Sequence, residues 1–210
     1  MSDQNYITSF CSIKSSKVCI NSHIDYSESS QVSSIDFLKS AYKHYQLAYP
    51  KFYKMDSLCK LALITSDLLL KTNKITENYN KEEIAIVIAN SVSSLETDVE
   101  YQTTIDKNNY FPSPTVFVYT LPNILLGEIA IRNGIKGENT FFVFDKFDAG
   151  FMSSYINSLL NNSRAKCCIT GWVDFYENKV ESFLYTVEKQ PGIMNIEHTS
   201  EQLTKLYTNQ

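Results

Sequence analysis

Cysteine and histidine are the side chains from which nucleophilic or metal chemistry is most often built, and this sequence has five cysteines and three histidines. They are Cys11, Cys19, Cys59, Cys167, Cys168, His23, His44 and His198. Cys167 and Cys168 are adjacent rather than spaced as metal ligands, and the histidines form no HExxH or HxxxH pattern. We therefore predict no metal site and no cofactor. An odd number of cysteines without a signal-peptide pattern predicts reduced thiols in the cytoplasm.

A basic cluster is the second group of residues that could have a function. Lys51, Lys54 and Lys60 lie at the start of an apolar segment and are interleaved with aromatic residues at 52–53. Three exposed cations would attract an acidic partner. The alternative is that the three lysines only keep an apolar helix soluble. Both interpretations stay open.

Other catalytic patterns are absent from the sequence. It contains no P-loop, no GxSxG elbow and no GxGxxG after a strand. Acidic neighbours such as Glu82 and Glu83 are typical of solvated helix faces and caps. Only six glycines occur, which is few for loops that cradle phosphates.

The composition limits the class of protein. The chain has 210 residues with 43% hydrophobic side chains, a formal net charge of −4 and a pI near 5.4. This composition predicts a packed core and argues against a nucleic-acid surface. The longest apolar runs, at 61–64 and 68–70, are too short for a membrane span.

Hydrophobic patterning predicts the elements that must position these residues. Residues 54–71 form a helix that is apolar almost all round and therefore buried, and 83–90 form a strand covered on both faces. The other expected strands are 6–13, 17–21, 140–145, 165–175 and 180–187, with a short extended piece at 115–119. The other expected helices are 35–47, 94–105, 120–132, 149–162 and 199–207. Residues 22–34 are expected to be a polar loop. The alternation predicts a single α/β domain with a mixed central sheet between helix layers.

Several segments resemble one family in the same order and at similar spacing over about residues 50–175. They are KMDSLCKLALITSDLLL, IAIVIANSVSSLETDVEYQTTI, FPSPTVFVYTLPNILLGEIAIRNGIKGEN and NSRAKCCITGWVD. They resemble the N-terminal half of β-ketoacyl-[acyl-carrier-protein] synthases, of the thiolase-like superfamily. Short members of this kind occur with aryl polyene and flexirubin-type biosynthetic clusters. The resemblance implies a layered α-β-α half fold over residues 1–190, followed by a terminal tail with a short helix at 191–210.

The resemblance also implies a dimer strand. Residues 140–145 correspond to the strand that pairs across a two-fold axis in such synthases, with Phe141, Phe142, Val143 and Phe144 as its apolar residues. A bare apolar edge is an aggregation hazard, and a closed two-fold interface covers it. The alternative is a strand in the middle of the sheet that pairs only within the chain.

The family nucleophile is replaced in this sequence. Counting without gaps from 137–139 to Gly171, the catalytic cysteine of the family falls on Lys146. A protonated lysine forms no thioester, because that chemistry needs a thiolate. No segment resembles the C-terminal half that supplies the family's two histidines and lysine, and His198 lies in the tail. Lys146 is expected to be a structural replacement paired with Asp145 or Asp148, rather than an amine that forms Schiff bases.

These observations predict a non-catalytic ketosynthase-like accessory protein in fatty-acid- or polyketide-type biosynthesis. Its expected partners are a second copy of itself or a full-length ketosynthase, with an acyl carrier protein docking at Lys51, Lys54 and Lys60. The resemblance is at the level of fold, and function is inferred by analogy. One alternative is a thioester hydrolase or transferase that uses Cys11, Cys59, Cys167 or Cys168. Another is a homodimer that binds an acyl or aromatic ligand beyond Tyr119.

Overall fold

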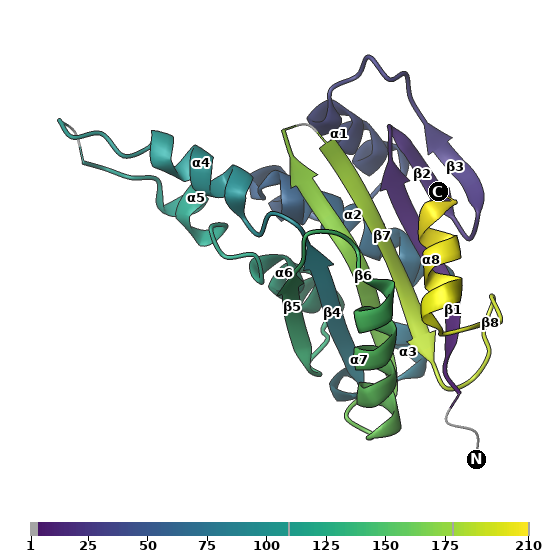
Figure 1. Cartoon of the computed structure of the whole chain (residues 1–210). Helices are drawn as coiled ribbons and strands as arrows, with labels where there is room; N and C mark the ends of the chain where they lie inside the picture. The colour runs from purple at the N-terminus through teal and green to yellow at the C-terminus, as the bar shows by residue number, and fades with distance from the viewer. Residues whose placement is uncertain (1–3, 109, 178, 210) are drawn as a thin grey trace.

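One mixed sheet forms the centre of the molecule in the computed structural model, which describes residues 4–108, 110–177 and 179–209. Its strand order is β3-β2-β1-β7-β6-β4-β5, and β8 pairs with β1 outside this path. β4 is parallel to both β5 and β6, and the remaining pairings are antiparallel. Helices cover both faces of the sheet, and α4 and α5 project from it as an arm (Figure 1).

The elements follow the chain in the order expected for an α/β domain. The strands are β1 (Tyr6–Lys14), β2 (Lys17–Ile20), β3 (His23–Ser27), β4 (Ile84–Asn90), β5 (Asn139–Val143), β6 (Cys167–Tyr176), β7 (Lys179–Glu188) and β8 (Ile196–Glu197). The α-helices are α1 (Ser34–His44), α2 (Ser57–Asn73), α3 (Ile75–Asn78), α4 (Leu95–Thr103), α5 (Pro114–Val118), α6 (Ile124–Asn133), α7 (Ala149–Asn161) and α8 (Ser200–Thr208). The short 3-10 helices are η1 (Pro50–Lys54) and η2 (Lys81–Glu83).

β4 shows why the domain has three layers. Ile84, Ile86 and Ile88 belong to the apolar cluster under α1, α2 and α6. The intervening residues at 85, 87 and 89 belong to the cluster under α7 and α8. Successive side chains on a strand point to opposite faces, so a strand that is apolar at every position needs cover on both sides. The predicted layered α/β fold with a mixed sheet is confirmed.

Helix α2 anchors one face of the sheet. The carboxylate of Asp56 accepts a 2.9 Å hydrogen bond from the Cys59 N–H and caps the helix, which ends where Lys74 adopts a left-handed conformation. Most of its residues from Leu58 to Leu70 are buried, as their apolar pattern predicts. α2 therefore lies between the sheet and the flanking helices α1 and α6.

The last residues of the chain complete the other face. β8 pairs with β1, and the fully buried Leu203 of α8 joins the cluster that α7 forms with the sheet. A polar seam (Asn5, Asn157, Asn161 and His198) runs beside these apolar contacts. The Asn157 carboxamide oxygen lies 2.8 Å from His198 Nδ1 and accepts from Asn5 at 2.9 Å. Residues 191–209 thus pack against the domain expected at residues 1–190.

Gly171 lies at the centre of the antiparallel β6–β7 pair, opposite Leu184. Its φ is +142°, and a Cβ atom placed on it would lie 1.9 Å from the carbonyl oxygen of Phe183. Only glycine combines this backbone conformation with so close an approach of the neighbouring strand.

Two local expectations are wrong. The loop expected at 22–34 contains β3, which pairs with β2 through backbone hydrogen bonds. Its side chains stay largely exposed, so the sequence shows no alternation of apolar and polar residues that would predict a strand. The extended piece expected at 115–119 is helix α5. Ser113 accepts from the Val116 N–H, and Pro114 occupies the first turn, which is a helix start rather than a strand break.

Candidate functional site

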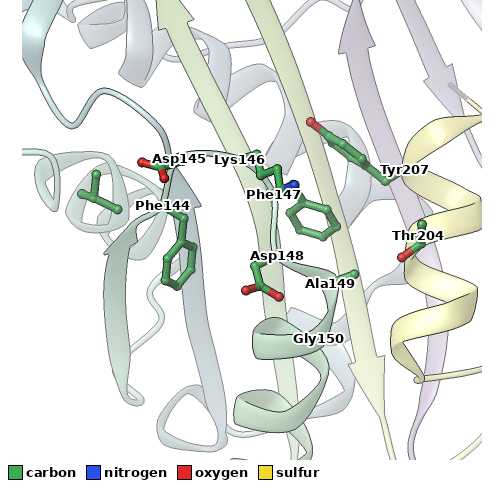
Figure 2. A pocket seen from close by; sticks show the side chains of 10 residues that line it. Phe144, Asp145, Lys146, Phe147, Asp148, Ala149, Gly150, Thr204 and Tyr207 are labelled. Atoms are coloured by element: carbon green, nitrogen blue, oxygen red, sulfur yellow. The ribbon is translucent and has the colours of Figure 1, made fainter.

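The loop between β5 and α7 holds the candidate site. It lies beyond the carboxyl ends of the parallel strands β4 and β5, where open α/β sheets place their ligands. The N–H of Phe144 donates to the carbonyl of Asn90 at 3.0 Å, and Asp148 caps α7 by accepting from Phe151 N–H at 2.8 Å. A pocket of about 610 Å³ opens here, lined by residues 143–150 together with Thr204 and Tyr207 of α8 (Figure 2).

Phe147 is the side chain of this loop that enters the core. Its ring is buried, and its centroid lies 4.5 Å from that of Tyr207, 5.9 Å from Phe183 and 6.2 Å from Trp172. Figure 2 shows the ring turned toward Tyr207. The inward position before α7 is therefore filled by a hydrocarbon ring, which provides no nucleophile or proton donor.

Lys146 lies on the surface of the same loop. Its side chain is exposed, and in the described part of the chain it forms no ion pair with Asp145 or Asp148. The expected salt bridge is thus wrong. An exposed ammonium is solvated by water, so it gains little from an adjacent carboxylate.

The sequence did not indicate that Thr204 and Tyr207 would line this pocket. Both come from α8, more than fifty residues after the loop, and only the packing of α8 beside α7 brings them there. Burial and the nearby Glu181 carboxylate raise the pKa of the Tyr207 phenol above its usual range. Tyr207 is therefore a neutral hydroxyl at neutral pH and no general base. The amphipathic pattern of the terminal helix was the available signal.

The cysteines named as possible nucleophiles are distributed through the core. Cys11, Cys59, Cys167 and Cys168 are buried, and burial raises the pKa of each thiol well above its usual range. A buried neutral thiol is unreactive toward thioesters. Cys19 on β2, which was not among the candidates, is the one cysteine with partial exposure among these five free thiols.

The three lysines of the basic cluster have different environments. Lys51 forms a 2.5 Å ion pair with the buried carboxylate of Glu128 on α6. Lys60 is half-buried and donates to the backbone carbonyl of Met55, and burial lowers its pKa. Lys54 is exposed and has no ion pair within the described residues. Only Lys54 is thus fully available to a partner.

β5 forms one edge of the sheet. It pairs with β4 on one side, and on its other side no strand in the described residues pairs with it. Phe141 packs toward the α2 face, Phe142 and Phe144 stack at 5.7 Å on the α7 face, and Val143 is 51% exposed. The alternative that this strand lies in the middle of the sheet is therefore wrong, and its role as a dimer strand remains a prediction.

The arm carries further exposed apolar side chains. These are Leu95, Val99, Tyr110, Phe111, Phe117, Val118 and Leu121. Figure 1 shows the arm extending from the β5 side of the sheet. Concentrated apolar exposure of this kind marks an interaction surface.

Other site types find no support in the described residues. They contain no cluster of three His, Cys, Asp or Glu side chains arranged for a metal ion. None of the helices described there has both the length and the apolar character that a bilayer crossing requires. His198 lies in the polar seam, where burial lowers its pKa to about 3, so it stays neutral.

Comparison with known proteins defines the class of fold. No protein-family model and no curated protein matches this sequence. Among solved structures, the ishigamide ketosynthase/chain length factor matches 89% of this chain with a TM-score of 0.64 and 17% identity. The complex of a type II polyketide acyl-carrier protein with its hexaketide-bound ketosynthase, AntDE:AntF, also matches 89% of the chain, with a TM-score of 0.61 and 11% identity.

A third structure extends the comparison. The ketosynthase ApeO in complex with its chain length factor ApeC, from Xenorhabdus doucetiae, matches 90% of this chain and 80% of its own, with a TM-score of 0.56 and 14% identity. The chain spans 62% and 63% of the first two structures, which is less than two thirds of their length. At these identities the likeness shows the fold alone: the chain shares its layered α/β fold with part of these ketosynthase and chain length factor structures.

Proposed function

We propose that this chain is a ketosynthase-like partner subunit that does not itself form the acyl-enzyme. The observation that carries this proposal is the loop before α7, where Phe147 fills the inward position and Lys146 is exposed. Acyl transfer needs a nucleophilic side chain at the inward position, and the Phe147 ring supplies none. The pathway we propose is fatty-acid- or polyketide-type biosynthesis, such as that of aryl polyene-like pigments, in the reducing cytoplasm.

The proposed contact with a partner is the free edge of β5 together with the arm. The unpaired backbone groups of an edge strand bind another strand readily, and the apolar arm lies on the same side of the sheet. Two of the matching structures are described as a ketosynthase with a chain length factor. We propose by analogy that this chain pairs with a full-length ketosynthase, or with a second copy of itself.

Co-purification with a full-length ketosynthase, and light scattering of the chain alone, test this proposal. Val143→Lys places a charge on the free edge at an exposed position, so it should abolish pairing while the fold is retained. Ile193→Lys is the matched control, because Ile193 is 62% exposed and lies shortly before β8, which pairs with β1 rather than with β5. Equal pairing by both variants would show that β5 is not the interface.

We further propose that an acyl carrier protein docks at the surface of Lys51, Lys54 and Lys60. One matching structure is described as a carrier protein with its ketosynthase, and carrier docking here is an analogy. Lys54→Glu is the sharpest test, because Lys51→Glu would also place a second carboxylate beside Glu128. Lys54→Glu should weaken carrier binding at least fivefold in a titration at low salt, whereas Lys189→Glu should leave it unchanged.

A thioester-processing enzyme is the alternative, and it predicts a different outcome. Incubation with acyl thioesters followed by intact-mass analysis should give no stable adduct, since the four candidate thiols are buried and protonated. An acyl adduct that peptide mapping places on one of these four cysteines would contradict the non-catalytic proposal.

A further inference from the structure

A second pocket lies at the opposite end of the sheet from β5. Its volume is about 440 Å³, and it lies between α8 and the strands β1, β2 and β3. Figure 1 shows α8 beside β1 and the outer strands β2 and β3, and residues of all four elements line the pocket. The candidate site described above shares no residue with this pocket.

Three lysines line this pocket. Lys14 and Lys17 are directly opposite each other in the β1–β2 register, so their side chains lie on the same face, and Lys205 approaches from α8. Glu181 pairs with Lys14, and Glu201 pairs with Lys205, each at 2.7 Å. Lys17 has no ion pair within the described residues. The pocket therefore contains at least one uncompensated cation beside two others.

The turn that brings Lys14 and Lys17 together is conformationally costly. Ser15 and Ser16 form its two central residues with φ of +50° and +57°, a region that glycine and asparagine favour. Glu181 offsets the charge of Lys14, so the ammonium group left for a bound anion to neutralise is that of Lys17.

The floor of the pocket is largely apolar. Phe10 and Leu206 provide hydrocarbon, and Cys19 is half-buried between the strands. Ser12 also lines the pocket, where it lies opposite Cys19 in the β1–β2 register.

From this arrangement we infer a binding site for a small anionic amphiphile, a phosphate or carboxylate monoanion or dianion with a short alkyl chain. The head group lies among Lys14, Lys17 and Lys205, and the alkyl chain lies along Phe10 and Leu206 beside Cys19. The volume is within the range of small-ligand pockets, which combine an apolar lining with a few placed polar groups. This site is independent of the proposed partner interface at β5.

Cys19 supplies a direct readout of occupancy, because the other four thiols are buried. Labelling by the neutral reagent N-ethylmaleimide is followed by intact mass in the presence of octyl phosphate or octanoate. Both should slow the labelling of Cys19 at least fivefold at saturation. Octanol, which lacks the charge, and inorganic phosphate, which lacks the chain, should protect at least tenfold less effectively at equal concentration.

Variants locate the protection at the pocket. Lys17→Glu should raise the concentration of octyl phosphate needed for half-protection at least tenfold, whereas Lys189→Glu, an exposed lysine outside the pocket, should leave it unchanged. Circular dichroism confirms that both variants fold. Equal protection by octanol, or unchanged protection in Lys17→Glu, would overturn the proposal. Protection by phosphatidic acid vesicles but not by monomeric octyl phosphate would also overturn it, since the surface would then bind membranes.

Discussion

The two faces of the sheet are built differently. Under α1, α2 and α6 the buried polar groups are paired. The carboxylates of Glu128 and Asp67 pair with Lys51 and Arg132, and Asn73 of α2 donates to Thr8, Thr186 and Glu188. Under α7 and α8 apolar packing is interrupted by the polar seam, in which Asn5 Oδ1 and His198 Nε2 are buried without a hydrogen-bond partner. Both pockets considered above also adjoin α8. The α2 face therefore provides stability, while the α7–α8 face provides sites.

The largest difference between the two faces is expected when two equally buried leucines are replaced. Leu61→Ala in α2 should lower the free energy of unfolding by about 3 kcal/mol, because α2 is covered on every side and cannot relax. Leu203→Ala in α8 should lower it by only about 1 kcal/mol, because the loss is limited by local opening of the terminal segment. Denaturant titration measures both values, and hydrogen exchange should increase in residues 196–209 only for Leu203→Ala. Equal losses would contradict the difference between the faces.

An intermediate effect is expected at the charged pairs. Lys51→Ala leaves the Glu128 carboxylate buried with only the hydroxyls of Tyr49 and Tyr119, each at 3.4 Å. The expected loss of unfolding free energy is about 2 kcal/mol, the cost of a buried charge left without its partner. Lys54→Ala is the control and should change stability by less than about 0.5 kcal/mol. The same measurement would show that Lys51 is merely a surface charge if the two variants behave alike.

The smallest effect is a pH dependence confined to the seam. The pKa of His198 is about 3 in the folded protein and near 6.5 when unfolded, so protonation below pH 6.5 favours the unfolded chain. Stability should fall by about 1 kcal/mol between pH 6.5 and pH 5.5, given about 1.4 kcal/mol per pH unit. His198→Asn should remove this slope, whereas His23→Asn should preserve it. Thermal unfolding at several pH values measures the slope of stability against pH in both variants. An unchanged slope in His198→Asn would show that other groups cause the pH dependence.

The sequence predicted those features whose physical cause is local. The all-round apolar pattern of α2 and the uninterrupted β-branched run of β4 indicated buried elements between layers, and both are observed. β3 escaped prediction because its stability comes from backbone pairing with β2, which side-chain types do not record. Helix α5 escaped because Ser113 and Pro114 are typical of both a chain break and a helix start.

The candidate site was less predictable than the fold. The sequence indicated the loop around Lys146, and the structure places a pocket there. It did not indicate that Phe147 rather than its neighbour would face the core, because a one-residue change of register decides which side chain points inward. The contribution of Tyr207 depends on packing between distant segments. In the sequence Lys51 looks like any surface lysine, and only its contact with Glu128 reveals a structural role.

Gly171 gives this chain a fixed point for alignment with distant proteins of the same fold. At sequence identities of 17% and below, most positions carry too little information to set a residue correspondence. Since any Cβ here would lie only 1.9 Å from the Phe183 carbonyl oxygen, every side chain is excluded while the β6–β7 register is kept. An aligned protein with any other residue here has either shifted its strands or been misaligned. A glycine at the position of Gly171 is therefore a check on any alignment of this chain with distant proteins.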